Sequence, residues 1–151
     1  MPHRGLFELR TPADLVRKLQ HDFLRMEESP EDQYAAFDFF VTAEHIVDWI
    51  HPDDEAARRA LRSSNALLRA TSHLANGAKH FQARAKHHRS VVGTEKQRYV
   101  DSGYVEDGYL GEPLVIYLEY EESLEIGARE IEAKVLARDV LEYWKRNVPA
   151  A

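Results

Sequence analysis

The chain has 151 residues, of which 44% are hydrophobic and 30% charged, with a net charge of −6 and no cysteine. This composition fits one globular domain, argues against a general nucleic-acid coat protein, and excludes disulfides, thiolate metal sites and cysteine nucleophiles. No apolar run reaches the roughly 20 residues that span a bilayer, and residues 1–10 lack the apolar stretch of a secretion signal. We therefore expect a cytoplasmic protein that makes no membrane contact.

The first two helices are marked by their start signals. Thr11 followed by Pro12 predicts an N-cap and first helical position, and apolar residues then recur at helical spacing. Ser29 and Pro30 repeat this signal, with Glu31 and Asp32 expected in the first turn of the second helix. That helix should run to about His51, because Pro52 stops it.

The second helix is apolar almost all round, which predicts a central position in a bundle. It nevertheless carries a polar stripe at helical spacing: Asp38, Thr42, His45 and Asp48. Buried carboxylates are costly unless they are paired or hydrogen-bonded. These residues must therefore meet partners, face water in a cleft, or lie at an oligomer seam.

The rest of the chain predicts two more helices, a β element and a final helix. A third helix should start near Asp53 or Asp54 and cover 55–62, and a fourth should cover about 65–85, unless the two form one continuous helix. Leu114–Tyr120 has the β-branched and aromatic content of a strand, with a partner strand expected within 124–131 and a turn at 121–123.

These elements predict a mainly α fold in one domain, residues 1–151. We expect an up-and-down bundle of four to five helices (about 11–89), a small antiparallel β hairpin (about 112–131) and a C-terminal helix (about 135–148). Tyr99-Val100 and Tyr104-Val105 suggest either a short strand pair or a loop. Because a hairpin is marginally stable alone, it should dock on the bundle.

A polar cluster in the fourth helix is the main candidate site. Helical spacing brings His73, Asn76, Lys79 and His80 toward one side, with Gly77 among them. A helical glycine costs about 1 kcal/mol relative to alanine and often marks a close approach to the backbone. Imidazole, lysine and amide groups supply the acid–base chemistry, charge stabilisation and orientation that a metal-independent ribonuclease needs. Alternatively, these residues satisfy neighbouring polar groups such as Asp38, Glu44 and Asp48.

Two further sets of residues suggest ligand binding. His45 and Asp48 on one helix, with His73 and His80 on another, are suitable metal ligands, although no sharper metal motif is present. Basic and histidine side chains between residues 84 and 88 provide phosphate contacts for RNA or a nucleotide, or else form a solvated helix end; these are Arg84, Lys86, His87 and His88. No cofactor motif is present, so we expect no cofactor.

The string Ala75-Asn76-Gly77-Ala78-Lys79-His80-Phe81 and the helical layout resemble HEPN domains, a class of small prokaryotic helical proteins. The resemblance covers residues 32–89 and implies a helical bundle that is often a homodimer and that binds or cleaves RNA without a metal. It implies that His80 takes the place of the catalytic histidine and Asn76 that of the polar residue. Ala75 stands where the family motif has arginine, so substitution by Lys79 or by an arginine of a partner chain is needed for catalysis.

The charge distribution supports a second hypothesis, a non-catalytic interaction module. Residues 79–98 carry six basic side chains and one acidic side chain, which gives +5, whereas residues 101–132 carry ten acidic and one basic, which gives −9. The acidic hairpin from Glu112 to Glu132 would then dock a basic protein partner. Alternatively, the two segments lie beside each other and neutralise one another.

Overall fold

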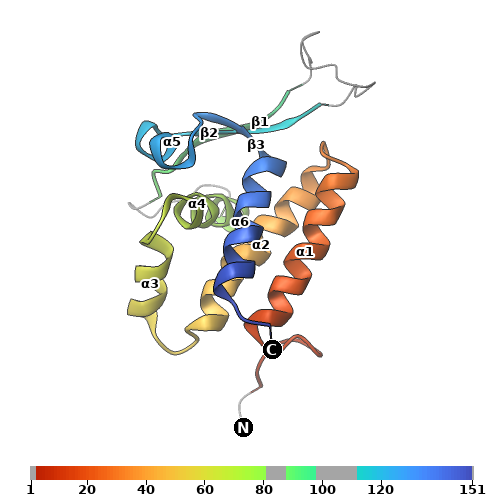
Figure 1. Cartoon of the computed structure of the whole chain (residues 1–151), viewed down its shortest axis with the longest axis vertical. Helices are drawn as coiled ribbons and strands as arrows, with labels where there is room; N and C mark the ends of the chain where they lie inside the picture. Colours follow the sequence, from red (N-terminus) through yellow and green to blue (C-terminus); the bar gives the residue numbers. More distant parts are fainter. Residues whose placement is uncertain (1–2, 81–87, 98–111, 151) are drawn as a thin grey trace.

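The fold is mainly helical, with a small antiparallel sheet near the C-terminal helix (Figure 1). The computed structural model describes residues 3–80, 88–97 and 112–150. Its elements, in chain order, are α1 (Pro12–Glu28), α2 (Gln33–Ile50), α3 (Glu55–Ser63), α4 (Ala66–His80), β1 (Val91–Lys96), β2 (Leu114–Leu118), α5 (Tyr120–Ile126), β3 (Glu130–Glu132) and α6 (Ala133–Asn147). Helices α1, α2 and α6 lie alongside one another, whereas α4 crosses them below the sheet (Figure 1).

The predicted start of α1 is confirmed. The backbone N–H of Asp14 donates to Thr11 Oγ1 at 3.2 Å, and the N–H of Thr11 donates to Asp14 Oδ2 at 2.9 Å. This reciprocal pair is a capping box, and Pro12 occupies the first helical position. The local sequence therefore specifies this end of the helix without help from tertiary contacts.

The predicted start of α2 at Pro30 is wrong. Asp32 caps the helix, because its Oδ1 accepts from the N–H groups of Tyr34 and Ala35 at 2.9 and 3.2 Å. Ser29 instead terminates α1, with its N–H donating to the carbonyl of Arg25. Serine favours a cap, but the aspartate three residues later satisfies the first N–H groups of the helix, so the Ser-Pro pair belongs to the connection.

The third and fourth helices are separate, as the weak break at 63–65 allowed. Asp54 caps α3 by accepting from the N–H of Ala57. Asn65 Oδ1 accepts from the N–H of Leu68 at 3.0 Å, and Glu125 Oε1 accepts from the N–H of Ala66 at 3.0 Å. A carboxylate from α5 thus completes the N-terminus of α4. Of the fourth helix as predicted, the part between 81 and 85 lies outside the described residues.

The predicted antiparallel pairing over 112–131 is confirmed in part, because β2 pairs with the following strand β3, whereas the predicted turn is wrong and β1 adds a third strand. The sheet has three antiparallel strands in the order β1-β2-β3, with Val115 opposite Glu132 and Glu95 opposite Val115. Residues 121–123, predicted as the turn, lie in α5, which ends at Gly127 in the left-handed conformation (φ 102°) that favours glycine. The segments Tyr99-Val100 and Tyr104-Val105 lie outside the described residues.

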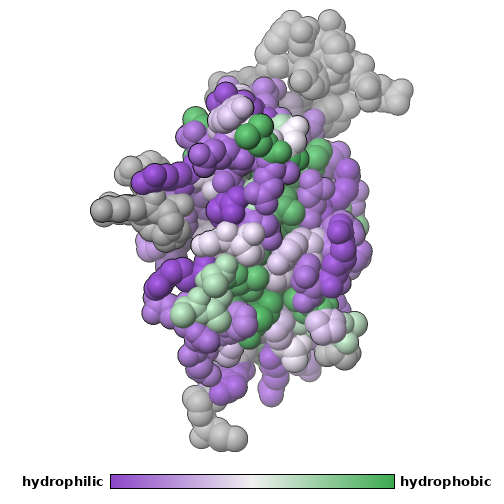
Figure 2. Space-filling model, turned by 60° about the vertical axis from the view of Figure 1, so that its left-hand side comes forward, coloured by the Kyte–Doolittle hydropathy of each residue, from purple (hydrophilic) through white to green (hydrophobic). Residues whose placement is uncertain are grey.

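The core is built around α2, as its composition predicted. Ala35, Phe39, Ala43 and Ile46 have no exposed surface, and α2 contacts α1, α3, α4 and α6. The sheet adds Val115, Ile116, Leu118 and Ile131, and α6 adds a fully buried face that includes Trp144. On one face of the molecule hydrophilic side chains cover most of the surface, with small hydrophobic patches between them (Figure 2).

The helices in the described part of the chain are all too short or too polar to span a bilayer.

A buried carboxylate links α1 to α2. Asp22 is 2% exposed and accepts from Lys18 Nζ at 2.7 Å and from Thr42 Oγ1 at 3.1 Å. Lys18 Nζ also donates to Thr42 Oγ1 at 2.9 Å, and Arg25 lies 3.6 Å from Asp22. Arg25 in turn donates to Asp38 Oδ2 at 2.7 Å. Two members of the polar stripe on α2, Asp38 and Thr42, therefore have partners on α1.

Removal of the Asp22 carboxylate should destabilise the fold. In Asp22→Ala, the hydroxyl of Thr42 stays buried without its acceptor, so we expect the free energy of unfolding to fall by about 2–3 kcal/mol. Chemical denaturation followed by circular dichroism measures this change. The exposed Glu28→Ala on the same helix should change stability by about 0.5 kcal/mol or less, and equal stabilities for the two variants would contradict the role assigned to Asp22.

Candidate functional site

Two grooves flank α4, and most of the predicted site residues line them. The first, the polar groove, lies between α2 and α4 and has a volume of about 610 Å³. It is lined by Phe37, Val41, Glu44, His45, Asp48, Arg62, Ser72, Ala75, Asn76, Lys79, His80 and His88. The second, the sheet groove, has a volume of about 710 Å³ and lies between α2, α4 and the strands β1 and β2.

The polar groove joins side chains that the sequence keeps far apart. His45 comes from α2, whereas Asn76, Lys79 and His80 come from the last turn of α4. Lys79, His80 and His45 are exposed and Asn76 is half-buried, so all four are open to a ligand. His45 and Asp48 of the second helix therefore line the same groove as Asn76, Lys79 and His80.

His73 does not share this groove. It lines the sheet groove, where its Nδ1 accepts from the N–H of Val91 at 3.1 Å. Burial lowers the pKa of His73 below its ordinary value. The neutral ring, which accepts at Nδ1, holds β1 against α4. The expected four-residue cluster is thus a group of three, with His73 on the other side of α4.

His88 lines the polar groove and also lies beside His73, which lines the sheet groove. Its ring centroid lies 5.6 Å from that of His73, with the two rings tilted by 41°. The other three residues of the basic stretch, Arg84, Lys86 and His87, lie outside the described residues.

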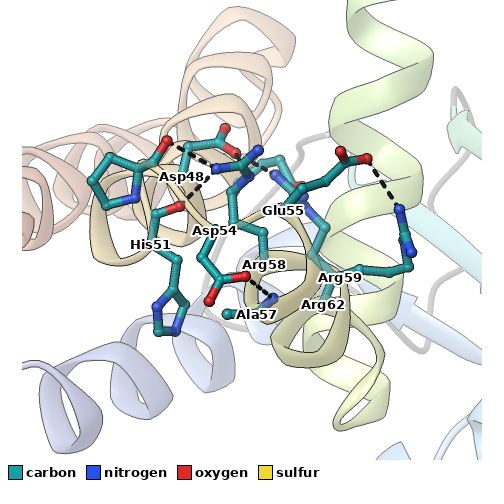
Figure 3. A network of polar contacts seen from close by, with 10 residues as sticks. Asp48, His51, Asp54, Glu55, Ala57, Arg58, Arg59 and Arg62 are labelled. Carbon is teal, nitrogen blue, oxygen red and sulfur yellow. Dashed lines mark hydrogen bonds and ion pairs between the residues drawn. The ribbon is translucent and has the colours of Figure 1, made fainter.

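Arg62 is a groove residue that sequence reasoning did not identify. Its guanidinium pairs with Glu44 through Nε and with Asp48 through Nη2, the latter at 2.6 Å. Arg58, one turn earlier on α3, lies 3.6 Å from Asp48 and donates to the carbonyls of His51 and Pro52 (Figure 3). The spacing of Arg58 and Arg62 at i and i+4, matched by Glu44 and Asp48 on α2, was the available signal.

The pairing decides the charge of the groove. Glu44 and Asp48, which we predicted as binding residues, compensate Arg62, so the three charges sum to −1 and Lys79 brings the sum to zero. Burial raises the pKa of Glu44 above its ordinary value, although Arg62 acts to lower it. Arg62 therefore stabilises a buried carboxylate, and Lys79 is the groove cation that is exposed to a ligand.

Gly77 faces the sheet groove and is not packed by the described chain. A Cβ atom built at this position meets no atom within 4 Å. The fold of the described residues therefore does not require glycine here, and the backbone of α4 is open to the groove at this point.

A metal site from His45, Asp48, His73 and His80 does not fit the geometry. His73 lines a different groove from the other three. Among the described residues, no group of three or more His, Asp or Glu side chains is arranged to hold a metal ion.

The acidic segment is partly neutralised within the fold, but not by the basic stretch alone. Arg69 of α4 donates to both carboxylate oxygens of Glu122, at 3.0 and 3.2 Å, and to Glu125 at 2.7 Å. Glu112 lies 3.4 Å from Lys96 on the edge of the sheet. The outer face of α5 keeps Tyr120, Glu121 and Leu124 exposed.

Comparison of the chain with protein-family models, with curated proteins and with solved structures gave no match.

Removal of Arg62 should make stability fall as the pH rises. Because burial raises the pKa of Glu44 above 4.5 in the folded chain, folding is favoured where Glu44 is protonated and loses stability as the pH rises through the raised pKa. Without Arg62 the pKa of Glu44 in the folded chain rises further. We therefore expect the free energy of unfolding of Arg62→Ala to fall by about 2–4 kcal/mol near pH 7 and by less near pH 4. Denaturant unfolding at the two pH values measures this difference.

Two variants control this experiment. Arg59→Ala removes an exposed arginine from the same helix and should change stability little at either pH. Glu44→Gln in the Arg62→Ala background should restore stability near pH 7. A loss from Arg62→Ala that is the same at both pH values would show that Glu44 does not depend on this partner.

Proposed function

We propose that the polar groove binds RNA and cleaves it without a metal ion. The observation that carries this proposal is that His45 from α2 and His80 from α4 line one open groove together with Lys79 and Asn76. Two imidazoles, one cation and one amide are a complete set of groups for metal-independent phosphodiester transfer. The resemblance of residues 75–81 to the HEPN motif points to the same chemistry.

The reaction needs two proton transfers on one phosphate. A neutral imidazole takes the proton of the 2′-hydroxyl, whose oxygen then forms a bond to the adjacent phosphorus. A protonated imidazole donates to the 5′-oxygen as its bond to phosphorus breaks, which leaves a 2′,3′-cyclic phosphate and a 5′-hydroxyl. His80 and His45 take these two roles, because they come from opposite walls of the groove.

Lys79 and Asn76 assist the two histidines. The ammonium of Lys79 neutralises the charge that develops on the phosphate oxygens, and the amide of Asn76 orients the substrate by hydrogen bonding. Arg62 does not replace the arginine of the family motif, because two carboxylates hold its guanidinium. The positive charge at the phosphate therefore falls to Lys79. The homodimer that the HEPN resemblance implies stays a prediction.

Cleavage of end-labelled RNA tests this proposal. We expect wild-type protein to cut RNA in the presence of EDTA, and His80→Ala or His45→Ala to lose about 100-fold or more in rate. His21→Ala, which removes an exposed histidine of α1 outside both grooves, should keep the wild-type rate. Failure of the wild-type protein to cut or bind RNA would contradict the proposal.

A second candidate is the non-catalytic interaction module, with α5 as the docking element for a basic protein partner. The observation in its favour is that Tyr120, Glu121 and Leu124 are exposed together, next to the exposed Glu119, while Arg69 fixes the opposite face of the helix. The short helix therefore presents an acidic and apolar surface on a rigid base.

Co-purification from the native host at moderate salt tests this candidate. A stoichiometric partner should be lost in Glu119→Lys/Glu121→Lys and kept in Lys145→Glu, which changes an exposed charge on α6. Glu122 must be left unchanged, because it is buried against Arg69 and its reversal would disrupt the fold. Retention of the partner by the double variant would rule out this surface.

A further inference from the structure

Phe37 lies where the two grooves meet. It is among the residues that line the polar groove and among those that line the sheet groove. Its side chain is 52% exposed, in a helix whose neighbouring Phe39 and Phe40 are 0% and 6% exposed. An aromatic ring at this position exposes apolar surface to water, which is unfavourable. The ring does not fill the core, where Phe39 and Phe40 lie instead.

From this position we infer that the substrate is single-stranded RNA and that one unpaired base stacks on Phe37, an inference that rests on the function proposed above. Aromatic rings exposed beside cationic groups are the usual platform for unpaired bases, because every base has a face that stacks on them. Lys79 binds the phosphate in the polar groove, and the neighbouring base enters the sheet groove across Phe37.

Gly77 provides the space for this base. It lines the sheet groove together with Phe37, and a Cβ atom at Gly77 would project into open space. The bare backbone lets a flat ring approach α4 closely, which a side chain would hinder. The glycine that the described fold does not require is thus explained by the ligand.

Stacking on Phe37 would disfavour double-stranded RNA as the substrate. A base in a duplex is paired and stacked on its neighbours, so it reaches Phe37 only after it is unpaired. Phe37 therefore selects unpaired segments of RNA, whereas Lys79 and the histidines act on any phosphodiester that reaches them.

Binding measurements with a fluorescent base test the inference. The His80→Ala protein is used as the background, so that the RNA stays intact. The probe is a single-stranded RNA 12-mer with one 2-aminopurine, whose fluorescence is quenched when the base stacks. In this background Phe37→Ala should weaken binding roughly 5- to 100-fold and abolish the quenching, whereas Phe37→Trp should retain both.

Two further variants complete the design. Tyr34→Ala removes a more exposed aromatic ring (79%) from the same helix, one turn away and outside both grooves, and should bind as the background does. Gly77→Ala should fold at least as stably as the background, because alanine favours the helix, yet bind RNA more weakly. Circular dichroism and thermal unfolding confirm that each variant is folded.

The outcomes separate this inference from the proposed function. If the background protein binds the 12-mer and Phe37→Ala binds and quenches like Tyr34→Ala, the stacking role is wrong and the RNA-binding groove stands. If the background protein binds a 12-base-pair RNA duplex as tightly as the single strand, selection of unpaired bases is wrong. If the background protein and wild type bind neither RNA, the proposed function fails and this inference fails with it.

Discussion

The need to compensate the polar groups of α2 determines much of this structure. The helix packs against α1, α3, α4 and α6 and carries several fully buried core residues, yet it also bears carboxylates. Each of these meets a cation from a neighbouring helix: Arg25 of α1 lies beside Asp38, and Arg62 of α3 lies beside Glu44 and Asp48. Glu44 is the least exposed of these carboxylates, at 15%, so its pairing with Arg62 matters most to the packing of α3 on α2 because an unpaired buried charge is costly.

One position of the polar stripe has no such role. His45 remains exposed on α2 between the two groups of ion pairs, facing the end of α4. The same helix that supplies the centre of the core therefore supplies one wall of the polar groove. A site built on two packed helices holds its side chains more firmly than a site built on loops, which suits chemistry that depends on two positioned imidazoles.

The two grooves differ in what they offer a ligand. The polar groove contributes histidines, Lys79 and an Arg62 paired with two carboxylates. The sheet groove contributes apolar side chains, the open backbone at Gly77 and a neutral His73, together with Glu95 and Lys96 of β1. Phe37 belongs to both. Under the proposed function, this division would separate phosphate contact from base contact along α2 and α4, with Lys79 offsetting the charge of −1 that Glu44, Asp48 and Arg62 leave in the polar groove.

The sequence by itself determined the features that depend on neighbours along the chain. The capping box of Thr11 and Asp14, the central place of an almost wholly apolar α2, and Leu114–Leu118 as a strand all follow from local spacing and composition. The tertiary structure alone decided that β1 pairs with β2, because these strands are far apart in the sequence, and that residues 120–126 form a helix whose Glu122 and Glu125 pair with Arg69. It also decided the site: helical spacing grouped His73 with His80, but the strand β1 occupies the His73 side of α4, and the packing of α2 beside α4 brings His45 to His80 instead.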